Sequence, residues 1–167
     1  TLVAEELDAD WSQIRVEGAP ADAKRYNNLF WGPAQGTGGS SAIANAYEQM
    51  RKAGATARAM LVTAAARRWN VSESEVRVAK GMVSHRSGKK AKFGELAADA
   101  AQVPVPAEVK LKDPRQFVYI GKKVTRTDVR SKSNGSAVFT QDVKLPGMLT
   151  ALVAHPPRFG GRLKSFD

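Results

Sequence analysis

The sequence predicts an α+β fold that contains one long helix, and three observations support this. Residues 41–68 place small and apolar side chains at helical spacing. Two short strand candidates, 76–79 and 82–85, are joined at Lys80-Gly81 and indicate a β-hairpin. Short apolar runs bounded by turn residues then recur to the end of the chain, so we expect the last third to be mainly β.

The elements before the long helix are short. We expect residues 1–7 to be the last part of a helix that exposes Glu5 and Glu6. Apolar and polar residues alternate over 13–17, which predicts a short strand that Ala19-Pro20 ends.

A connection of more than 20 residues precedes the long helix. It contains Tyr26, Phe30 and Trp31, aromatic side chains that are typical of packing. A connection of this length inside a domain is usually functional or buried against a neighbour.

The long helix would extend for about 40 Å at 1.5 Å per residue and end at Trp69-Asn70. Small residues dominate its predicted apolar face, which indicates close backbone packing inside a larger body. This face consists of Ile43, Ala46, Tyr47, Met50, Ala53, Gly54, Ala57, Leu61, Ala64 and Ala65.

The hairpin is followed by a turn at Ser87-Gly88 and a predicted helix over 93–101. Alternating prolines in 103–106 exclude a helix and predict an extended linker, so we place a boundary at 103–116. Beyond this boundary we expect strands at 117–120, 138–139 and 148–154.

Composition restricts the function classes. The net charge is +10, and residues 110–167 alone carry twelve Lys and Arg against four Asp and Glu. These basic residues have no interleaved aromatic platform, so a solvated surface is favoured over a nucleic-acid site, which stays an alternative. Cysteine is absent, which excludes disulfides and thiolate ligands from this chain. No apolar stretch is long enough to span a membrane.

The strongest candidate site is the Gly-rich run that leads into the long helix. Three glycines in four positions give the backbone freedom and let its N–H groups approach a ligand. A helix N-terminus stabilises an anion, and we expect the hydroxyl of Ser40 or Ser41 to cap it. The run fits neither the P-loop nor the dinucleotide fingerprint, so a tight surface turn is an equal alternative. The candidate cofactor-binding residues are Gln35, Gly36, Thr37, Gly38, Gly39, Ser40 and Ser41.

Other polar residues show no catalytic or metal-binding pattern. His85 and His155 have no nearby second ligand, which favours a surface or strand-end role. Asp8, Asp10 and Asp22 have no partner at a suitable spacing, so capping or surface roles are favoured. We assign no catalytic residue and no metal ligand.

Several segments together resemble one family, the molybdopterin-binding large subunit of bacterial aldehyde dehydrogenases. Within the xanthine dehydrogenase and aldehyde oxidase family, the chain is most similar to the branch that contains the β-subunit of isoquinoline 1-oxidoreductase. The segments that carry the resemblance are 4–11, 16–22, 35–41, 51–58, 94–97, 112–114, 135–137 and 145–149.

The resemblance implies a segment of a molybdenum hydroxylase that oxidises aldehydes or N-heterocycles. Residues 1–102 would be part of the molybdenum-cofactor-binding domain, 103–116 a linker, and 117–167 the incomplete start of an α/β hammerhead domain. Gln35 to Ser41 would contact a molybdopterin cytosine dinucleotide. Iron-sulfur clusters would lie on a partner subunit, with the remainder of the large subunit and a cytochrome c acceptor as further partners.

The resemblance also implies what this chain does not contain. The family's catalytic glutamate and its Gly-Gln-Gly loop have no counterpart here, so we expect a fragment that does not turn over substrate alone. A periplasmic location is favoured over a cytoplasmic one, and the substrate is not specified. The alternatives are a basic nucleic-acid-binding segment or a purely structural one without a cofactor.

Overall fold

The computed structural model describes residues 1–166, which form two compact units, one from Thr1 to Val129 and one from Arg130 onward. The predicted α+β class is confirmed, since helices accompany a small sheet. The helices are α1 (Leu2–Leu7), α2 (Ala23–Tyr26), α3 (Ser41–Trp69), α4 (Phe93–Ala100) and α5 (Val129–Ser133). The strands are β1 (Val76–Ala79), β2 (Met82–His85) and β3 (Lys90–Lys92).

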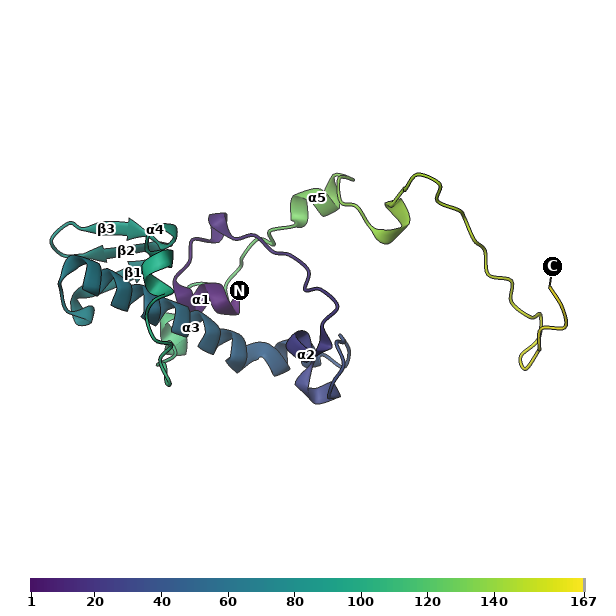
Figure 1. Ribbon diagram of the computed structural model, residues 1–167, viewed down its shortest axis with the longest axis horizontal. Coiled ribbons are helices and arrows are strands. Elements are labelled where there is room, and N and C mark those ends of the chain that lie inside the picture. Colours follow the sequence, from purple (N-terminus) through teal and green to yellow (C-terminus); the bar gives the residue numbers. More distant parts are fainter. Residues whose placement is uncertain (167) are drawn as a thin grey trace. The chain divides into compact units, whose positions relative to one another are not determined.

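Helix α3 is the central element of the first unit, as Figure 1 shows. Its predicted extent is confirmed, and it ends at Asn70, whose left-handed backbone directs its N–H to the last carbonyls. The predicted close packing is confirmed at Gly54. A methyl group there would lie 2.5 Å from the carbonyl oxygen of Val3 in α1. The N-terminal half of α3 differs from the prediction, because Ile43 is 68% exposed.

The sheet has the antiparallel order β1-β2-β3 and lies beside the C-terminal half of α3 (Figure 1). Val83 of β2 is opposite Val78 in β1 and Ala91 in β3. The predicted hairpin is confirmed, whereas β3 was not predicted because its sequence, Lys-Ala-Lys, offers one apolar residue.

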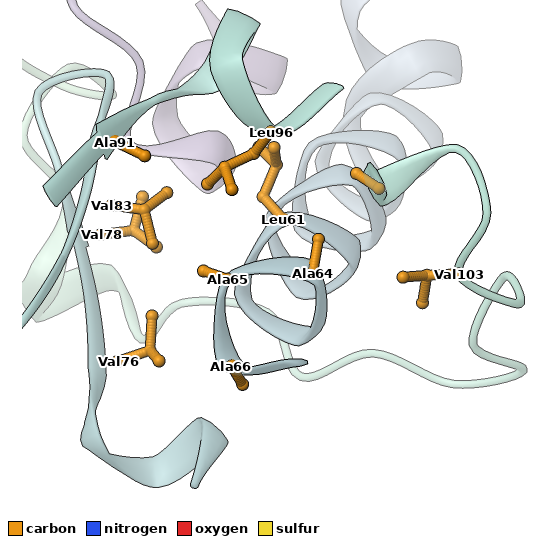
Figure 2. Packing of buried hydrophobic residues seen from close by; sticks show 11 residues of the cluster. Leu61, Ala64, Ala65, Ala66, Val76, Val78, Val83, Ala91, Leu96 and Val103 are labelled. Atoms are coloured by element: carbon orange, nitrogen blue, oxygen red, sulfur yellow. The ribbon is translucent and has the colours of Figure 1, made fainter. Parts of the chain in front are cut away.

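The hydrophobic core lies between this sheet, α3 and α4 (Figure 2). Val83 and Leu96 have no exposed surface, and the small residues Ala64 and Ala65 let the sheet approach the α3 backbone. Burying a Val or Leu side chain contributes about 1.5–3 kcal/mol. The core therefore holds the C-terminal half of α3 firmly.

Four strand predictions are wrong within the described residues. At 13–17 the chain forms a single 3₁₀ turn, Trp11–Gln13, followed by unpaired extended backbone. At 117–120 the N–H of Phe117 donates to the Pro114 carbonyl and the N–H groups of residues 118–120 donate to a carboxylate, so none of them forms a ladder. Residues 138–139 and 148–154 are not strands either, and no neighbouring strand pairs with them. Leu149 and Leu152, for example, are 89% and 93% exposed.

The long connection before α3 contains α2 and a 3₁₀ turn, Leu29–Trp31. The packing expected of its aromatic side chains is incomplete, because Tyr26, Phe30 and Trp31 remain 45%, 65% and 44% exposed. No helix within residues 1–166 has the length and apolarity to cross a bilayer. The linker at 103–116 and the hammerhead assignment stay predictions.

Candidate functional site

The Gly-rich loop is tied at both ends by one buried side chain, that of Asn28. Its amide nitrogen donates to the Ser41 hydroxyl at 2.8 Å and to the Gly36 carbonyl at 3.4 Å. Its backbone N–H donates to the carbonyl of Ala34 at 3.0 Å. Asn28 is only 4% exposed, so these bonds are partly shielded from water and fix where the loop meets α3.

The N-terminus of α3 has no side-chain cap among the described residues, so the predicted serine cap is wrong. Ser40 occupies the N-cap position with φ +54° and makes no capping bond. The Ser41 hydroxyl donates instead to the Gly38 carbonyl at 2.8 Å, and the Ser41 N–H donates to the same carbonyl at 3.1 Å. The left-handed backbone of Ser40 explains this, because an N-cap side chain normally reaches the first turn from an extended backbone.

The first turn of α3 is consequently an electropositive surface. The first four N–H groups of a helix have no intrahelical acceptor, and the first turn of α3 contains no acidic residue. Ile43 in this turn is 68% exposed, so solvent reaches it. An anionic group fits this arrangement of donors and would be stabilised by it.

Trp31 lies on the glycines of the loop. A methyl group at Gly38 would come within 2.8 Å of the indole ring, and one at Gly36 would overlap it. A side chain at either position would therefore require the Trp31 ring to move. Gly39 has φ +56° but open space around it, so it is a turn residue and not a seat for the ring.

The predicted site residues thus lie in one exposed loop and the first residue of α3. The side chain of Gln35 is bonded to the preceding connection, since its amide donates to the Pro20 carbonyl at 3.1 Å. Within residues 1–166, no group of three His, Cys, Asp or Glu side chains is arranged to hold a metal ion. The loop offers mainly backbone donors, which suits binding and not proton transfer.

A second polar cluster, which the sequence did not reveal, lies between α1, α3 and residues 112–120. We call it the carboxylate anchor; its members are Glu5, Glu6, Asp8, Arg51 and Lys112. The expectation that Glu5 and Glu6 are exposed is wrong, because they are 0% and 1% exposed.

Glu5 is the acceptor for three consecutive backbone N–H groups. Val118 donates to both carboxylate oxygens at 3.1 and 3.0 Å, and Tyr119 and Ile120 donate to Oε2 at 2.6 and 3.0 Å. The ammonium of Lys112 lies 3.2 Å from Oε1. Burial by itself would raise the pKa of Glu5, but the N–H groups of Ile120, Tyr119 and Val118 and the Lys112 ammonium outweigh it and lower that pKa.

Glu6, in α1, joins the two other parts of the anchor, which are α3 and residues 112–120. Its Oε1 accepts from Arg51 Nε at 2.7 Å, and its Oε2 accepts from the backbone N–H of Lys112 at 3.0 Å. Arg51 also donates to the Lys112 carbonyl at 2.7 Å and stacks on the ring of Phe117. The anchor therefore attaches residues 112–120 to both α1 and α3.

Asp8, Asp10, Asp22 and His85 have the capping and strand-end roles that were expected of them. Asp10 and Asp22 cap short helical turns, as expected, by accepting from the N–H groups of Ser12 and Arg25. Asp8 is the C-cap of α1, and its carboxylate also pairs with Lys112 at 2.6 Å and Arg58 at 3.1 Å. His85 lies at a strand end, as expected, with Nδ1 2.8 Å from the Ser87 hydroxyl.

Comparison with known proteins identifies relatives over nearly the whole chain. The beta subunit of isoquinoline 1-oxidoreductase from Brevundimonas diminuta is 37% identical, with 95% of this chain covering 25% of that protein. A membrane-bound aldehyde dehydrogenase (pyrroloquinoline-quinone) of Gluconacetobacter polyoxogenes is 32% identical over 99% of this chain and 21% of its own length. A nicotinate dehydrogenase subunit of Pseudomonas putida is 31% identical over 95% and 13%.

The chain spans a quarter or less of the length of these curated relatives. The family profile described as the molybdopterin cofactor-binding domain matches residues 1–143, which include the Gly-rich loop, α3 and the carboxylate anchor. The predicted resemblance is thereby confirmed, and the chain belongs to the molybdopterin cofactor-binding domain family.

Proposed function

We propose that this chain is a segment of the large subunit of a molybdenum hydroxylase and that residues 35–41 help to hold the cofactor. The observation that carries the proposal is the uncapped first turn of α3 behind the Gly-rich loop, in a segment matched by a molybdopterin cofactor-binding family. The dinucleotide form of the cofactor contains phosphate groups, which suit these donors.

The chain's own part in the reaction is binding and orientation. The backbone N–H groups of Ser40, Ala42 and Ile43 would donate to a phosphate, and the helix dipole adds a partial positive charge of about one half. Asn28 holds the loop in place through Ser41. The bound cofactor would supply the molybdenum chemistry that transfers a water-derived oxygen to a substrate carbon and accepts two electrons.

The finer features of the proposal come from the family. Substrates would be aldehydes or N-heterocycles, the cofactor the cytosine dinucleotide, and electrons would pass to iron-sulfur clusters on a partner subunit and then to a cytochrome c. A periplasmic location belongs to the same proposal. The names of the relatives, an isoquinoline oxidoreductase, an aldehyde dehydrogenase and a nicotinate dehydrogenase, support these substrate classes.

The test places a negative charge where the phosphate would lie. Ile43→Asp changes an exposed residue in the first turn of α3, where an acidic residue favours the helix itself. Two unit charges 4 Å apart at an effective dielectric constant of 20 repel each other by about 4 kcal/mol. We therefore expect the Asp variant of the complete protein to retain roughly a tenth or less of the wild-type molybdenum after gel filtration.

Ile43→Asn is the matched control, because Asn has almost the same shape as Asp without its charge. This variant should retain molybdenum as the wild type does. Equal molybdenum in both variants would refute the role of the loop. Because one relative's name includes pyrroloquinoline quinone, the same samples should be assayed for that quinone. Wild-type protein that holds quinone and no molybdenum would refute the hydroxylase proposal.

A further inference from the structure

Trp31 has a place in the loop that simple packing does not explain. Its ring rests on Gly36 and Gly38, where any larger side chain would collide with it. Gly38 is bonded through its carbonyl to the N–H and the hydroxyl of Ser41. The indole is therefore fixed beside the first turn of α3.

The ring also keeps unused binding capacity. Trp31 is 44% exposed, and within residues 1–166 its indole N–H has no hydrogen-bond acceptor. Trp11 shows the contrast: its N–H donates to the Thr125 carbonyl at 2.9 Å, and its ring contacts Tyr119. A Trp side chain that serves only packing is normally covered and has its N–H paired.

We infer that the indole of Trp31 is a wall of the cofactor site on which a planar heterocycle stacks, either the pterin or the nucleobase. This inference rests on the proposed function, since the phosphate at α3 would bring the heterocycle to the ring. Gly36 and Gly38 are then required because they let the ring lie flat beside the helix N-terminus. Base stacking on an aromatic side chain typically accounts for a roughly 5- to 150-fold gain in affinity.

The first experiment uses the complete protein prepared without cofactor, with Trp11 and Trp69 replaced by Phe. The sequence has three tryptophans, and any tryptophan elsewhere in the complete protein is replaced by Phe as well, so that Trp31 alone reports the binding. Cytidine 5′-monophosphate, a simple pterin and ribose 5-phosphate are titrated while Trp31 fluorescence is recorded. We expect quenching by the nucleotide or the pterin, which also tells which heterocycle stacks, and none by ribose 5-phosphate.

The second experiment measures affinity by calorimetry in protein with its other tryptophans intact. Trp31→Ala should bind the quenching heterocycle roughly 5- to 150-fold more weakly, and Trp31→Phe should lose less. Gly36→Ala, which keeps the ring but removes its seat, should reproduce the loss. Phe30→Ala is the control, because Phe30 is a neighbouring exposed aromatic residue that does not lie on the glycines. Melting temperatures show that each variant is folded.

The outcomes separate this inference from the proposed function. If ribose 5-phosphate binds but neither heterocycle quenches, or if Trp31→Ala binds both heterocycles normally, the role of Trp31 is refuted and the phosphate site stands. If none of the three compounds binds to any variant, both the stacking wall and the phosphate site are refuted.

Discussion

Replacing Glu5 by Gln should lower the free energy of unfolding by about 3 kcal/mol. The substitution keeps the shape of the side chain, but one amide oxygen replaces two charged oxygens that serve Lys112 and three backbone N–H groups. The amide NH₂ would also face N–H donors. A hydrogen bond to a charged group contributes about 1.5–3 kcal/mol, so the loss of two such bonds with partial relaxation gives this magnitude.

Urea unfolding of the complete protein measures this change, and hydrogen exchange locates it. The amides of Val118, Tyr119 and Ile120 should exchange faster in Glu5→Gln, whereas those of the β1–β2 hairpin should keep a higher protection. Glu108→Gln, an exposed change of the same chemistry, should shift stability by less than about 0.5 kcal/mol. A Glu5→Gln effect as small as that of this control would refute the assigned energetic role of the carboxylate anchor.

Three further outcomes follow from the structure. Because the pKa of folded Glu5 lies below its ordinary 4.5, the free energy of unfolding should fall as the pH drops below about 4.5. This free energy should depend less steeply on pH in Glu5→Gln, and an equal dependence in acid titrations of both proteins would contradict the reasoning. Gly54→Ala should lower the free energy of unfolding by about 1–3 kcal/mol in thermal melts, because the new methyl group pushes α1 away. Gly94→Ala should be neutral or stabilising by about 0.5–1 kcal/mol, because there is open space around Gly94. Leu96→Ala should lower the free energy of unfolding by about 2–5 kcal/mol in urea titrations, because Leu96 is fully buried. Leu149→Ala should change it by almost nothing, because Leu149 is 89% exposed.

The parts of the fold that depend on neighbouring residues could be predicted from the sequence. The extent of α3 follows from helical spacing, and the β1–β2 hairpin follows from two short strand candidates joined at Lys80-Gly81, which both adopt positive φ. Close backbone packing at Gly54 follows from a face of small residues, although the sequence did not show that α1 would be the partner.

The parts that depend on distant partners could not be predicted in this way. Val118 to Ile120 resemble a strand locally, yet their N–H groups bind a carboxylate more than a hundred residues earlier. Glu5 and Glu6 look like solvent-facing residues of a short helix for the same reason. At the loop, the glycines were visible, but nothing local showed that Trp31 would lie on Gly36 and Gly38. One signal was available for the anchor, since Arg51 and Arg58 are seven residues apart, on one face of a helix that packs through small residues.

The carboxylate anchor also sets an order for the formation of the first unit during synthesis. The hairpin and α4 contact the adjacent end of α3, so their interactions arise from chain segments made close together in time. Helix α1 leaves the ribosome before the other elements of this unit, but docking it would bury the Glu5 charge before residues 118–120 exist to donate to it. Helix α1 is therefore expected to stay undocked until those residues emerge, and its attachment is the step that closes the unit. A nascent chain halted before residue 118 should consequently leave α1 open to proteases and chaperones.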